Sequence, residues 1–360
     1  MEDDRERHRP LRVADDSALS TFIRTVEIRG CKLKKPNQLE VHRADTTRFS
    51  KVAVTATARE FQGIYRGKQY HSPDFQCTLE RASKAGVKKV MLTGMSLQDI
   101  DHNTSLVTST SLVTSHPDLC TLTIGIHPYH AAIPEDEIQS TMGELARRVT
   151  DAVSQSPSPI AAFGELGLDY DRVNYASKED QIRVFKAQLN CFVEHAWQLP
   201  LFLHCRAAFE DFTDIIRPYL SRLPKGGLVH SFVGSTAEMQ QLVGLGLDVS
   251  VNGFSFQDRE SVDMVAAIPL ERLQLETDAP WGEIKATSNL AKRYCVNAPP
   301  LPASKKRDKW DAGSMVKERN ESCTMQTVAY VVAGLKGCSV EEIAHAAWQN
   351  SAKMFGFTEM

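Results

Sequence analysis

Eight short apolar segments recur along the chain, and each is separated from the next by a stretch long enough to form a helix. They are KVAVTAT (51–57), KKVMLTG (88–94), TLTIGI (121–126), PIAAFGE (159–165), LPLFLH (199–204), GLVHSF (227–232), GLDVSV (246–251) and RLQLETD (272–278). Near-continuous apolar runs are typical of parallel strands that are buried on both faces. Eight such strands alternating with helices predict an α/β fold of the TIM-like (β/α)8 barrel type.

The segments between the runs support this prediction. In 181–196 the apolar residues recur at helical spacing, and 236–246 behaves similarly with Ser235 as its expected N-cap. Ser339 and Glu342 form the pattern of a capping box that opens a helix ending near Phe355. A barrel takes about 250 residues. We therefore predict one barrel domain over 49–360, preceded by an N-terminal extension, 1–48, that is poorly ordered or partly packed.

Polar residues of metal-binding type follow or end five of the predicted strands. They are His127, Glu165, His204, His230 and Asp278. In a barrel the carboxyl ends of the strands meet at one mouth, where active sites are built. One histidine or one carboxylate there is more often a hydrogen-bonded structural residue or a helix cap. Two histidines and two carboxylates on separate strands are rarely coincidental, so we predict Glu165, His204, His230 and Asp278 as metal ligands. Imidazole with carboxylate suits zinc, manganese, iron or, with more oxygen ligands, magnesium.

Composition limits the function classes. The 360 residues carry a net charge of −3, unlike a strongly basic nucleic-acid binder, although an enzyme can still meet phosphate through metal ions and a few arginines. No apolar run reaches the length of a membrane span. The opening residues MEDDRERHRP lack the apolar core of a secretion signal, and the eight cysteines form no CxxC pair. We expect reduced thiols in a cytoplasmic or nuclear protein that is not secreted.

Several motifs together resemble the TatD family of metal-dependent nucleases. They are FQGIYRGKQYH, VKKVMLTGMSLQDI, GIHPYHA, GELGLDYDR, LPLFLHCRAA, VHSFVGS, LETDAPW and RNESC. The resemblance covers about 49–357. The resemblance implies the same four ligands, Glu165, His204, His230 and Asp278. It also implies one or two divalent ions, Mg²⁺ first with Mn²⁺ or Zn²⁺ as alternatives. The implied activity is 3′→5′ exonucleolytic cleavage of single-stranded or frayed DNA, with RNA as a second substrate and no obligate protein partner.

Catalytic roles remain open among the ligands and their neighbours. Glu165 would bridge metals, as the resemblance implies, and Asp278 either accepts a proton from the attacking water or acts only as a ligand. His127 either contacts a substrate phosphate or supplies an acid near the leaving oxygen, and the alternative is a structural role beside Pro128.

Two arginines are candidates for binding substrate phosphate. Arg206 follows the His204–Cys205 pair and Arg172 follows the GLDYD turn, and a guanidinium matches phosphate in a bidentate way. The alternative for them is an ion pair with a carboxylate such as Asp169. Cys205 is expected in the core, because adjacent strand residues point to opposite faces.

The first strand departs from the family. Members commonly carry a stretch resembling DIGVNLTD, and the positions of its first Asp and its Asn are occupied here by Lys51 and Thr55. This change affects the expected binding site of a second metal ion more than that of the first. Two alternative readings therefore stay open: another metal-dependent hydrolase on the same barrel, and a nucleic-acid-binding barrel with reduced activity.

Overall fold

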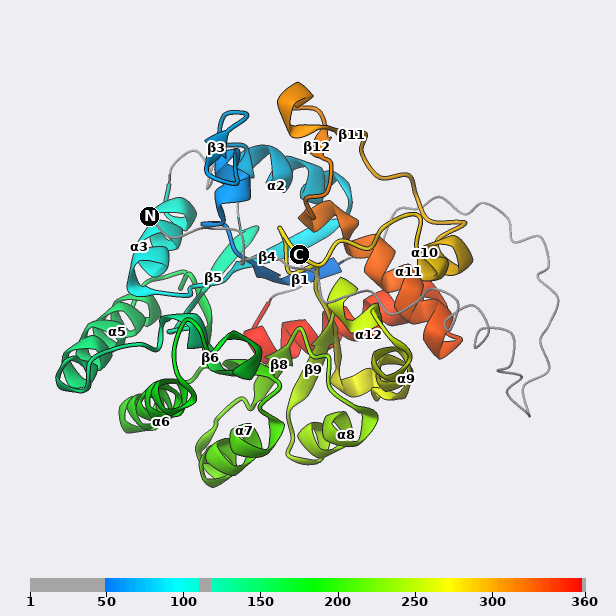
Figure 1. Cartoon of the computed structure of the whole chain (residues 1–360). Helices are drawn as coiled ribbons and strands as arrows, with labels where there is room; N and C mark the ends of the chain where they lie inside the picture. Colours follow the sequence, from blue (N-terminus) through cyan, green and yellow to red (C-terminus); the bar gives the residue numbers. More distant parts are fainter. Residues whose placement is uncertain (1–48, 110–117, 358–360) are drawn as a thin grey trace.

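The computed structural model describes residues 49–109 and 118–357, so the extension predicted over 1–48 lies outside the described residues. Its main sheet has eight parallel strands in the order in which they occur along the chain (Figure 1). They are β1 (Phe49–Val54), β4 (Val87–Leu92), β5 (Cys120–Ile124), β6 (Ile160–Asp169), β7 (Leu201–Arg206), β8 (Gly227–His230), β9 (Asp248–Val251) and β10 (Leu273–Leu275). Each of the eight predicted segments contributes one strand, which confirms the predicted α/β class and its strand pattern.

The sheet curls so that its first and last strands meet. Residue Val54 at the end of β1 forms a parallel bridge with Ala279, just beyond β10, and the Thr55 amide donates to the Ala279 carbonyl over 3.0 Å. This contact closes the barrel of a TIM-like fold at its mouth. The loops that follow β1 and β10 are therefore neighbours at one seam.

Helices surround the sheet (Figure 1). They are α2 (Phe75–Lys84), α3 (Leu97–Val107), α5 (Ile138–Val153), α6 (Lys178–His195), α7 (Phe209–Ile216), α8 (Thr236–Gly244), α9 (Arg259–Ala267), α10 (Asn289–Tyr294), α11 (Met325–Lys336) and α12 (Val340–Phe355). The helices predicted over 181–196, 236–246 and from Ser339 are confirmed as α6, α8 and α12. Among the described residues, no helix is both long and apolar enough to cross a membrane.

Two buried apolar clusters hold the barrel together. The larger one lies between sheet and helices and includes Cys205, so this cysteine is a core residue as predicted. The smaller one joins strand residues such as Phe202 to Met354, Phe355 and Phe357 at the end of α12. Asn350 of α12 donates to backbone carbonyls at the start of β10, which places this helix across the amino end of the barrel. The carboxyl end is therefore left for the functional site.

Sequence-encoded caps begin several of the helices. Ser235 and Glu238 form a reciprocal capping box at α8, and Ser339 and Glu342 form one at α12. Since an N-cap hydroxyl satisfies a backbone amide that has no partner within the helix, we expect Ser339→Ala to lower the free energy of unfolding by about 1 kcal/mol. Urea denaturation followed by circular dichroism measures this loss. Ser339→Asp is the control because it restores the acceptor, and an equal loss in both variants would contradict the capping role.

The long connection after β10 contains regular secondary structure. It contains α10 and two short strands, β11 (Ser304–Lys305) and β12 (Met315–Val316), which pair in parallel. A second small sheet, the antiparallel hairpin of β2 (Ile64–Tyr65) and β3 (Lys68–Gln69), lies in the connection after β1. Each of these strands has only two residues, which is too short to show an alternating apolar pattern, and this explains why the sequence pattern did not reveal them.

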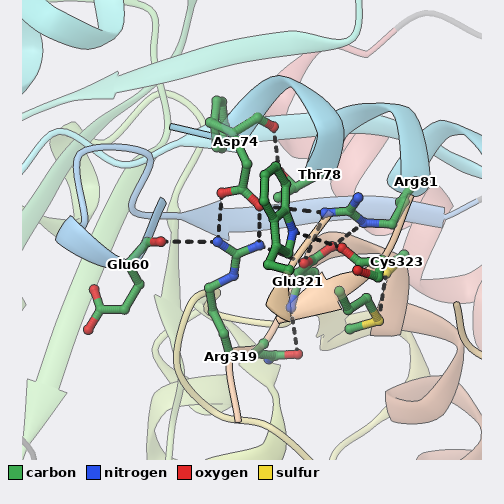
Figure 2. A network of polar contacts seen from close by, with 12 residues as sticks. Glu60, Asp74, Thr78, Arg81, Arg319, Glu321 and Cys323 are labelled. Atoms are coloured by element: carbon green, nitrogen blue, oxygen red, sulfur yellow. Dashed lines mark hydrogen bonds and ion pairs between the residues drawn. The ribbon is translucent and has the colours of Figure 1, made fainter. Parts of the chain in front are cut away.

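A buried network of charges, here called the ion cluster, joins these two connections (Figure 2). It consists of Asp74, Arg81, Arg319 and Glu321, whose side chains are at most 7% exposed. Arg319 binds Asp74 through both terminal nitrogens, at 2.7 and 2.6 Å, and reaches Glu321 at 2.8 Å. Arg81 binds the other side of Glu321 at 2.7 Å. Two cations face two carboxylates, so the charges balance within the cluster.

Candidate metal centre

Three imidazole rings converge on one carboxylate oxygen at the mouth of the barrel. The Oε1 atom of Glu165 lies 2.7 Å from Nδ1 of His204, 2.5 Å from Nε2 of His230 and 3.1 Å from Nε2 of His127. All four side chains are buried, with exposed fractions of 3–8%. Four of the five residues predicted from strand ends, His127, Glu165, His204 and His230, are thus brought together in one polar site.

Strand register explains why these residues meet. His204 and His230 are register partners at the ends of β7 and β8, and Gly167 of β6 pairs with His204. Gly167 has a φ of +146°, and a Cβ there would lie only 1.9 Å from the His204 carbonyl oxygen. Glycine therefore lets β6 approach β7 closely beside the site. Below the site, the Phe202 ring stacks on His230 at 4.6 Å between centroids and forms an apolar floor.

The outward nitrogens of His204 and His230 each face a second carboxylate. Nε2 of His204 lies 3.1 Å from Oδ2 of Asp169, and Nδ1 of His230 lies 3.6 Å from Oε1 of Glu276. A hydrogen-bonded carboxylate such as Asp169 holds the proton on the outer nitrogen of His204 and leaves its inner lone pair free for a metal. Glu276, in contrast, lies within ion-pair distance of His230 but outside hydrogen-bond distance. The inner nitrogens, Nδ1 of His204 and Nε2 of His230, are the ones that converge on Glu165. The geometry therefore fits both histidines as metal ligands.

His127 differs from the other two histidines. Its Nδ1 accepts a hydrogen bond from the Tyr129 amide over 3.1 Å, as the N-cap of a short 3-10 helix, Pro128–His130. Because a neutral imidazole with an acceptor Nδ1 carries its proton on Nε2, His127 donates to Glu165. His127, Glu165 and His204 also bring possible ligand atoms within 4.8 Å of one another. The hydrogen bond from Tyr129 nevertheless favours His127 as a donor toward substrate over His127 as a ligand.

Asp278 lies in a tight turn at the same mouth, with a φ of +53°. Asn320 holds this turn, because its side-chain amide donates to the carbonyls of Thr277 and Trp281, both over 2.7 Å. Burial raises the pKa of Asp278 to about 6, against the charge of His230 and with further upward contributions from Glu276 and Glu165. A carboxylate that titrates near neutrality can accept a proton as a general base.

The electrostatics of the metal-free centre link the carboxylate to its histidines. Although burial raises the pKa of Glu165, the charges of His230 and His127 hold that pKa well below its ordinary value. Conversely, burial lowers the pKa of His230 and of His204, but Glu165 together with Glu276 and Asp169 raises both above their ordinary range. The centre therefore favours a negatively charged Glu165 with positive charge beside it.

Metal affinity should consequently depend on pH. A ligand imidazole must be neutral, and the raised pKa values of His204 and His230 keep these rings protonated to higher pH than free imidazole. Metal affinity is therefore expected to rise with pH through neutrality, and each binding event should release about one proton or more. Calorimetric titration of Mn²⁺ in two buffers of different ionisation enthalpy measures the release. An affinity that stays constant between about pH 6 and about pH 8 would contradict this coupling.

The two predicted phosphate-binding arginines lie in different settings. Arg206 ends β7, donates from Nη2 to the Ser231 carbonyl over 3.2 Å and faces the Phe254 ring at 6.0 Å. Its Nε is buried and has no hydrogen-bond partner among the described residues, while the side chain as a whole is partly exposed. Arg172 is half-buried and donates to the backbone carbonyl of Asp171 over 3.1 Å. Asp169, the alternative partner considered for these arginines, instead binds His204.

Asp169 and Glu276 were not predicted as parts of the site. Asp169 lies four positions after Glu165 in the motif GELGLD, and Glu276 lies two positions before Asp278 in the motif LETD. Alternation along an extended segment places such residues on the same side as the ligand, and this signal could have found them.

Removing one of these supporting carboxylates should weaken the centre without destroying it. We expect Asp169→Asn to lower metal affinity by about 10- to 100-fold, as is usual when a carboxylate behind a ligand histidine is lost. Isothermal calorimetry with Mn²⁺ measures the change. Asp171→Asn is the matched control, since Asp171 is exposed and two residues away. Equal affinities for the Asp169 variant and the wild type would show that His204 does not depend on Asp169.

A (β/α)8 barrel with histidines and carboxylates gathered at the carboxyl ends of its strands is the arrangement of a metal-dependent hydrolase. Comparison with known proteins identifies the family within this class. A family model described as TatD related DNase matches residues 64–356. The chain therefore belongs to the TatD family, as its motifs predicted.

Individual relatives agree with this assignment. The chain is 38% identical over 314 residues to Deoxyribonuclease Tat-D of Schizosaccharomyces pombe, covering 85% of this chain and 95% of that protein. It is 33% identical to the 3'-5' ssDNA/RNA exonuclease TatD of Erwinia amylovora, covering 82% and 98%. Among solved structures, an uncharacterized amidohydrolase from Saccharomyces cerevisiae matches with a TM-score of 0.78 and 31% identity, covering 86% and 99%.

Proposed function

We propose that this protein is a metal-dependent deoxyribonuclease that removes nucleotides from the 3′ ends of single-stranded or frayed DNA and also accepts RNA. The observation that carries the proposal is the convergence of His127, His204 and His230 on Glu165 in a chain of the TatD family. The polarity and the single-stranded substrate come from relatives, one of which is named a 3'-5' ssDNA/RNA exonuclease.

The donor set of the site fits one or two divalent cations. We propose Glu165, His204, His230 and Asp278 as the ligands, with Mg²⁺ as the first candidate ion and Mn²⁺ or Zn²⁺ as alternatives. Several buried carboxylates and imidazoles face one another here, and such a group is stable when a cation lies between them. When bound, the ion lowers the pKa of a water ligand and withdraws charge from a phosphodiester.

The protein's own residues would then position the substrate and move protons. Asp278, in the turn at the mouth of the barrel, accepts the proton of the attacking water. His127 donates from Nε2 to a phosphate oxygen or to the leaving oxygen. Arg206, which is partly exposed at the end of β7, binds the phosphate through its guanidinium, and Arg172 adds positive charge to the substrate strand nearby.

The sequence of β1 affects the expected number of bound metal ions. Lys51 lies within β1, in register with Val90, and Thr55 lies just beyond the strand's end. Neither residue supplies the carboxylate that the family commonly has at the position of Lys51. We therefore propose that the ion held by Glu165, His204 and His230 is the one on which activity depends. Metal content measured at saturating Mn²⁺ tests the stoichiometry.

An end-labelled oligonucleotide tests the proposed activity and its polarity. With a 5′ label, 3′→5′ digestion produces a ladder of progressively shorter products, whereas a 3′ label is released at once as a mononucleotide. The full chain is assayed with Mg²⁺ or Mn²⁺ and with excess EDTA, on single-stranded and blunt duplex substrates. Absence of cleavage in every metal would contradict the proposed function, and release from the 5′ end would contradict its polarity.

A further inference from the structure

The connections that follow β1 and β10 carry aromatic rings and positively charged side chains close together, at the end of the barrel where the strands terminate. They are the hairpin of β2 and β3, residues 64–71, and the loop of β11 and β12, residues 304–317, here called the aromatic–basic rim. The first follows β1 and the second follows β10, so both leave the carboxyl end of the barrel, where Glu165 and the histidines lie.

Side chains of the two segments interlock at this rim. The His71 ring stacks on Trp310 with 4.7 Å between centroids and 30° between planes. The guanidinium of Arg307 lies 5.3 Å from the Tyr65 ring and 4.8 Å from the Tyr70 ring. All five side chains are partly exposed, so they form a surface of π-faces and positive charge and not a closed core.

The rim has the opposite charge from the chain as a whole. Residues 64–71 and 304–317 contain seven lysines and arginines but only two aspartates, while the whole chain has a net charge of −3. One of those aspartates, Asp311, is already paired with Lys305. Lys68, Lys306 and Lys309 are exposed. The excess positive charge at the mouth therefore faces solvent, where a polyanion can reach it.

The ion cluster makes this rim rigid. Arg319 donates to the Glu60 carbonyl over 3.0 Å and binds Asp74, so it holds both ends of the hairpin segment (Figure 2). Arg81 donates to the Ala312 carbonyl over 2.9 Å and so holds the loop. Asn320, next to Arg319, binds the turn of Asp278. Rim and metal centre are therefore fixed relative to each other by a short series of buried contacts.

We propose that the aromatic–basic rim binds the single-stranded part of the substrate, 5′ of the nucleotide that is removed. This rests on the proposed nuclease function and names where its strand lies. Nonspecific single-strand binding sites combine a basic track for phosphates with aromatic faces for bases, and the rim offers both. A purely acidic peptide would use the cations but would gain nothing from Tyr65, Tyr70 and Trp310.

Binding without catalysis tests the rim directly. Anisotropy of a fluorescent oligo(dT) of about 15 nucleotides is measured on the full chain in EDTA over a range of salt concentrations. Lys306→Ala/Lys309→Ala should weaken binding about 10-fold at low salt and flatten the log–log salt slope by about 1.4, the value for two lost phosphate contacts. Tyr70→Leu should weaken binding by about 5-fold or more at all salt concentrations.

The matched control is Lys84→Ala/Lys225→Ala, because both lysines are exposed and lie before β4 and β8, at the opposite end of the barrel. This control should bind within about twofold of the wild type. Unchanged binding in the rim variants, an equal loss in the control, or displacement of the oligonucleotide by poly-glutamate as readily as by unlabelled oligo(dT) would overturn the proposal.

A kinetic comparison separates failure of the rim from failure of the proposed function. With Mn²⁺, the rim variants should raise KM for the oligonucleotide about 10-fold and leave kcat unchanged. They should not affect hydrolysis of bis(p-nitrophenyl) phosphate, which is too short to reach the rim. If the wild type binds oligo(dT) at the rim but cleaves neither substrate, the proposed nuclease function is contradicted and the proposed binding site at the rim is supported. If cleavage is normal and the rim variants match the wild type in both assays, the rim proposal fails alone.

Discussion

Replacing Glu165 by glutamine is expected to lower kcat for oligonucleotide hydrolysis by about 10³-fold or more. The Lewis acidity of a bound ion is worth several kcal/mol, and each 1.36 kcal/mol corresponds to a factor of ten in rate. Among the described residues, Glu165 is the one side chain that contacts His127, His204 and His230 together, so its charge organises the whole centre. Steady-state kinetics with Mg²⁺ and Mn²⁺ measure the loss, and metal titration should show weakened binding in parallel.

Glutamine keeps the shape of glutamate, so the variant should stay folded. Glu144→Gln is the matched control, because Glu144 is an exposed glutamate of α5 that pairs only with neighbouring arginines. It should retain full activity, since exposed ion pairs contribute about 0–1 kcal/mol to stability. If Glu165→Gln kept its folded spectrum and more than about a tenth of the wild-type kcat, Glu165 could not be the central ligand.

Replacing Arg319 by alanine is expected to lower the free energy of unfolding by about 3–5 kcal/mol, the largest effect on stability that we predict. The side chain of Arg319 is 0% exposed, and its loss leaves the carboxylates of Asp74 and Glu321 buried with only Arg81 to neutralise them. The ring of Phe61, 5.1 Å from the guanidinium, would also lose its packing partner. Urea denaturation, followed by circular dichroism and by tryptophan fluorescence, measures the loss.

Arg147→Ala is the control for this prediction. Arg147 also contacts two carboxylates, Glu144 and Asp151, but its side chain is 56% exposed, so its removal should cost less than about 1 kcal/mol. A loss below about 1 kcal/mol for Arg319→Ala would show that the ion cluster does not hold the seam. Because Arg319 precedes Asn320, which binds the Asp278 turn, the destabilised variant should also lose activity at temperatures below its unfolding transition.

Much of the barrel could be predicted because its strands are buried on both faces. Burial on both faces requires apolar runs, and runs such as 121–126 and 199–204 are visible without any knowledge of the fold. The helix starts were equally visible, because Ser235 and Ser339 must supply hydroxyls to backbone amides. In both cases a local rule determines the structure, and local rules can be read from a sequence.

The ligands could be predicted for a similar reason. The carboxyl ends of the parallel strands lie together at one mouth of the barrel. Recognising that His204 and His230 each lie at the end of a strand was therefore enough to predict that they are neighbours. Residue pairs that are far apart in the sequence and meet only in the folded structure could not be predicted in this way. The pairing of Asp74 with Arg319 spans 245 residues of sequence, and nothing near either residue indicates the other. The same holds for the contact between His71 and Trp310 at the rim.

Some expectations from the sequence stay predictions. These are the division into an extension over 1–48 and a barrel over 49–360, a location in the cytoplasm or nucleus, and the absence of an obligate protein partner. The exact ligand set is also a proposal, and it is the central claim about this molecule.

Anomalous diffraction from crystals soaked in Mn²⁺ or Zn²⁺ tests that claim most directly. We expect an anomalous peak about 2.0–2.3 Å from a carboxylate oxygen of Glu165, Nδ1 of His204 and Nε2 of His230, with Asp278 in reach of the same ion or a second one. His127 should remain hydrogen-bonded to the Tyr129 amide. A peak bound by His127 but not by His230, or no peak at the barrel mouth, would contradict the proposed centre.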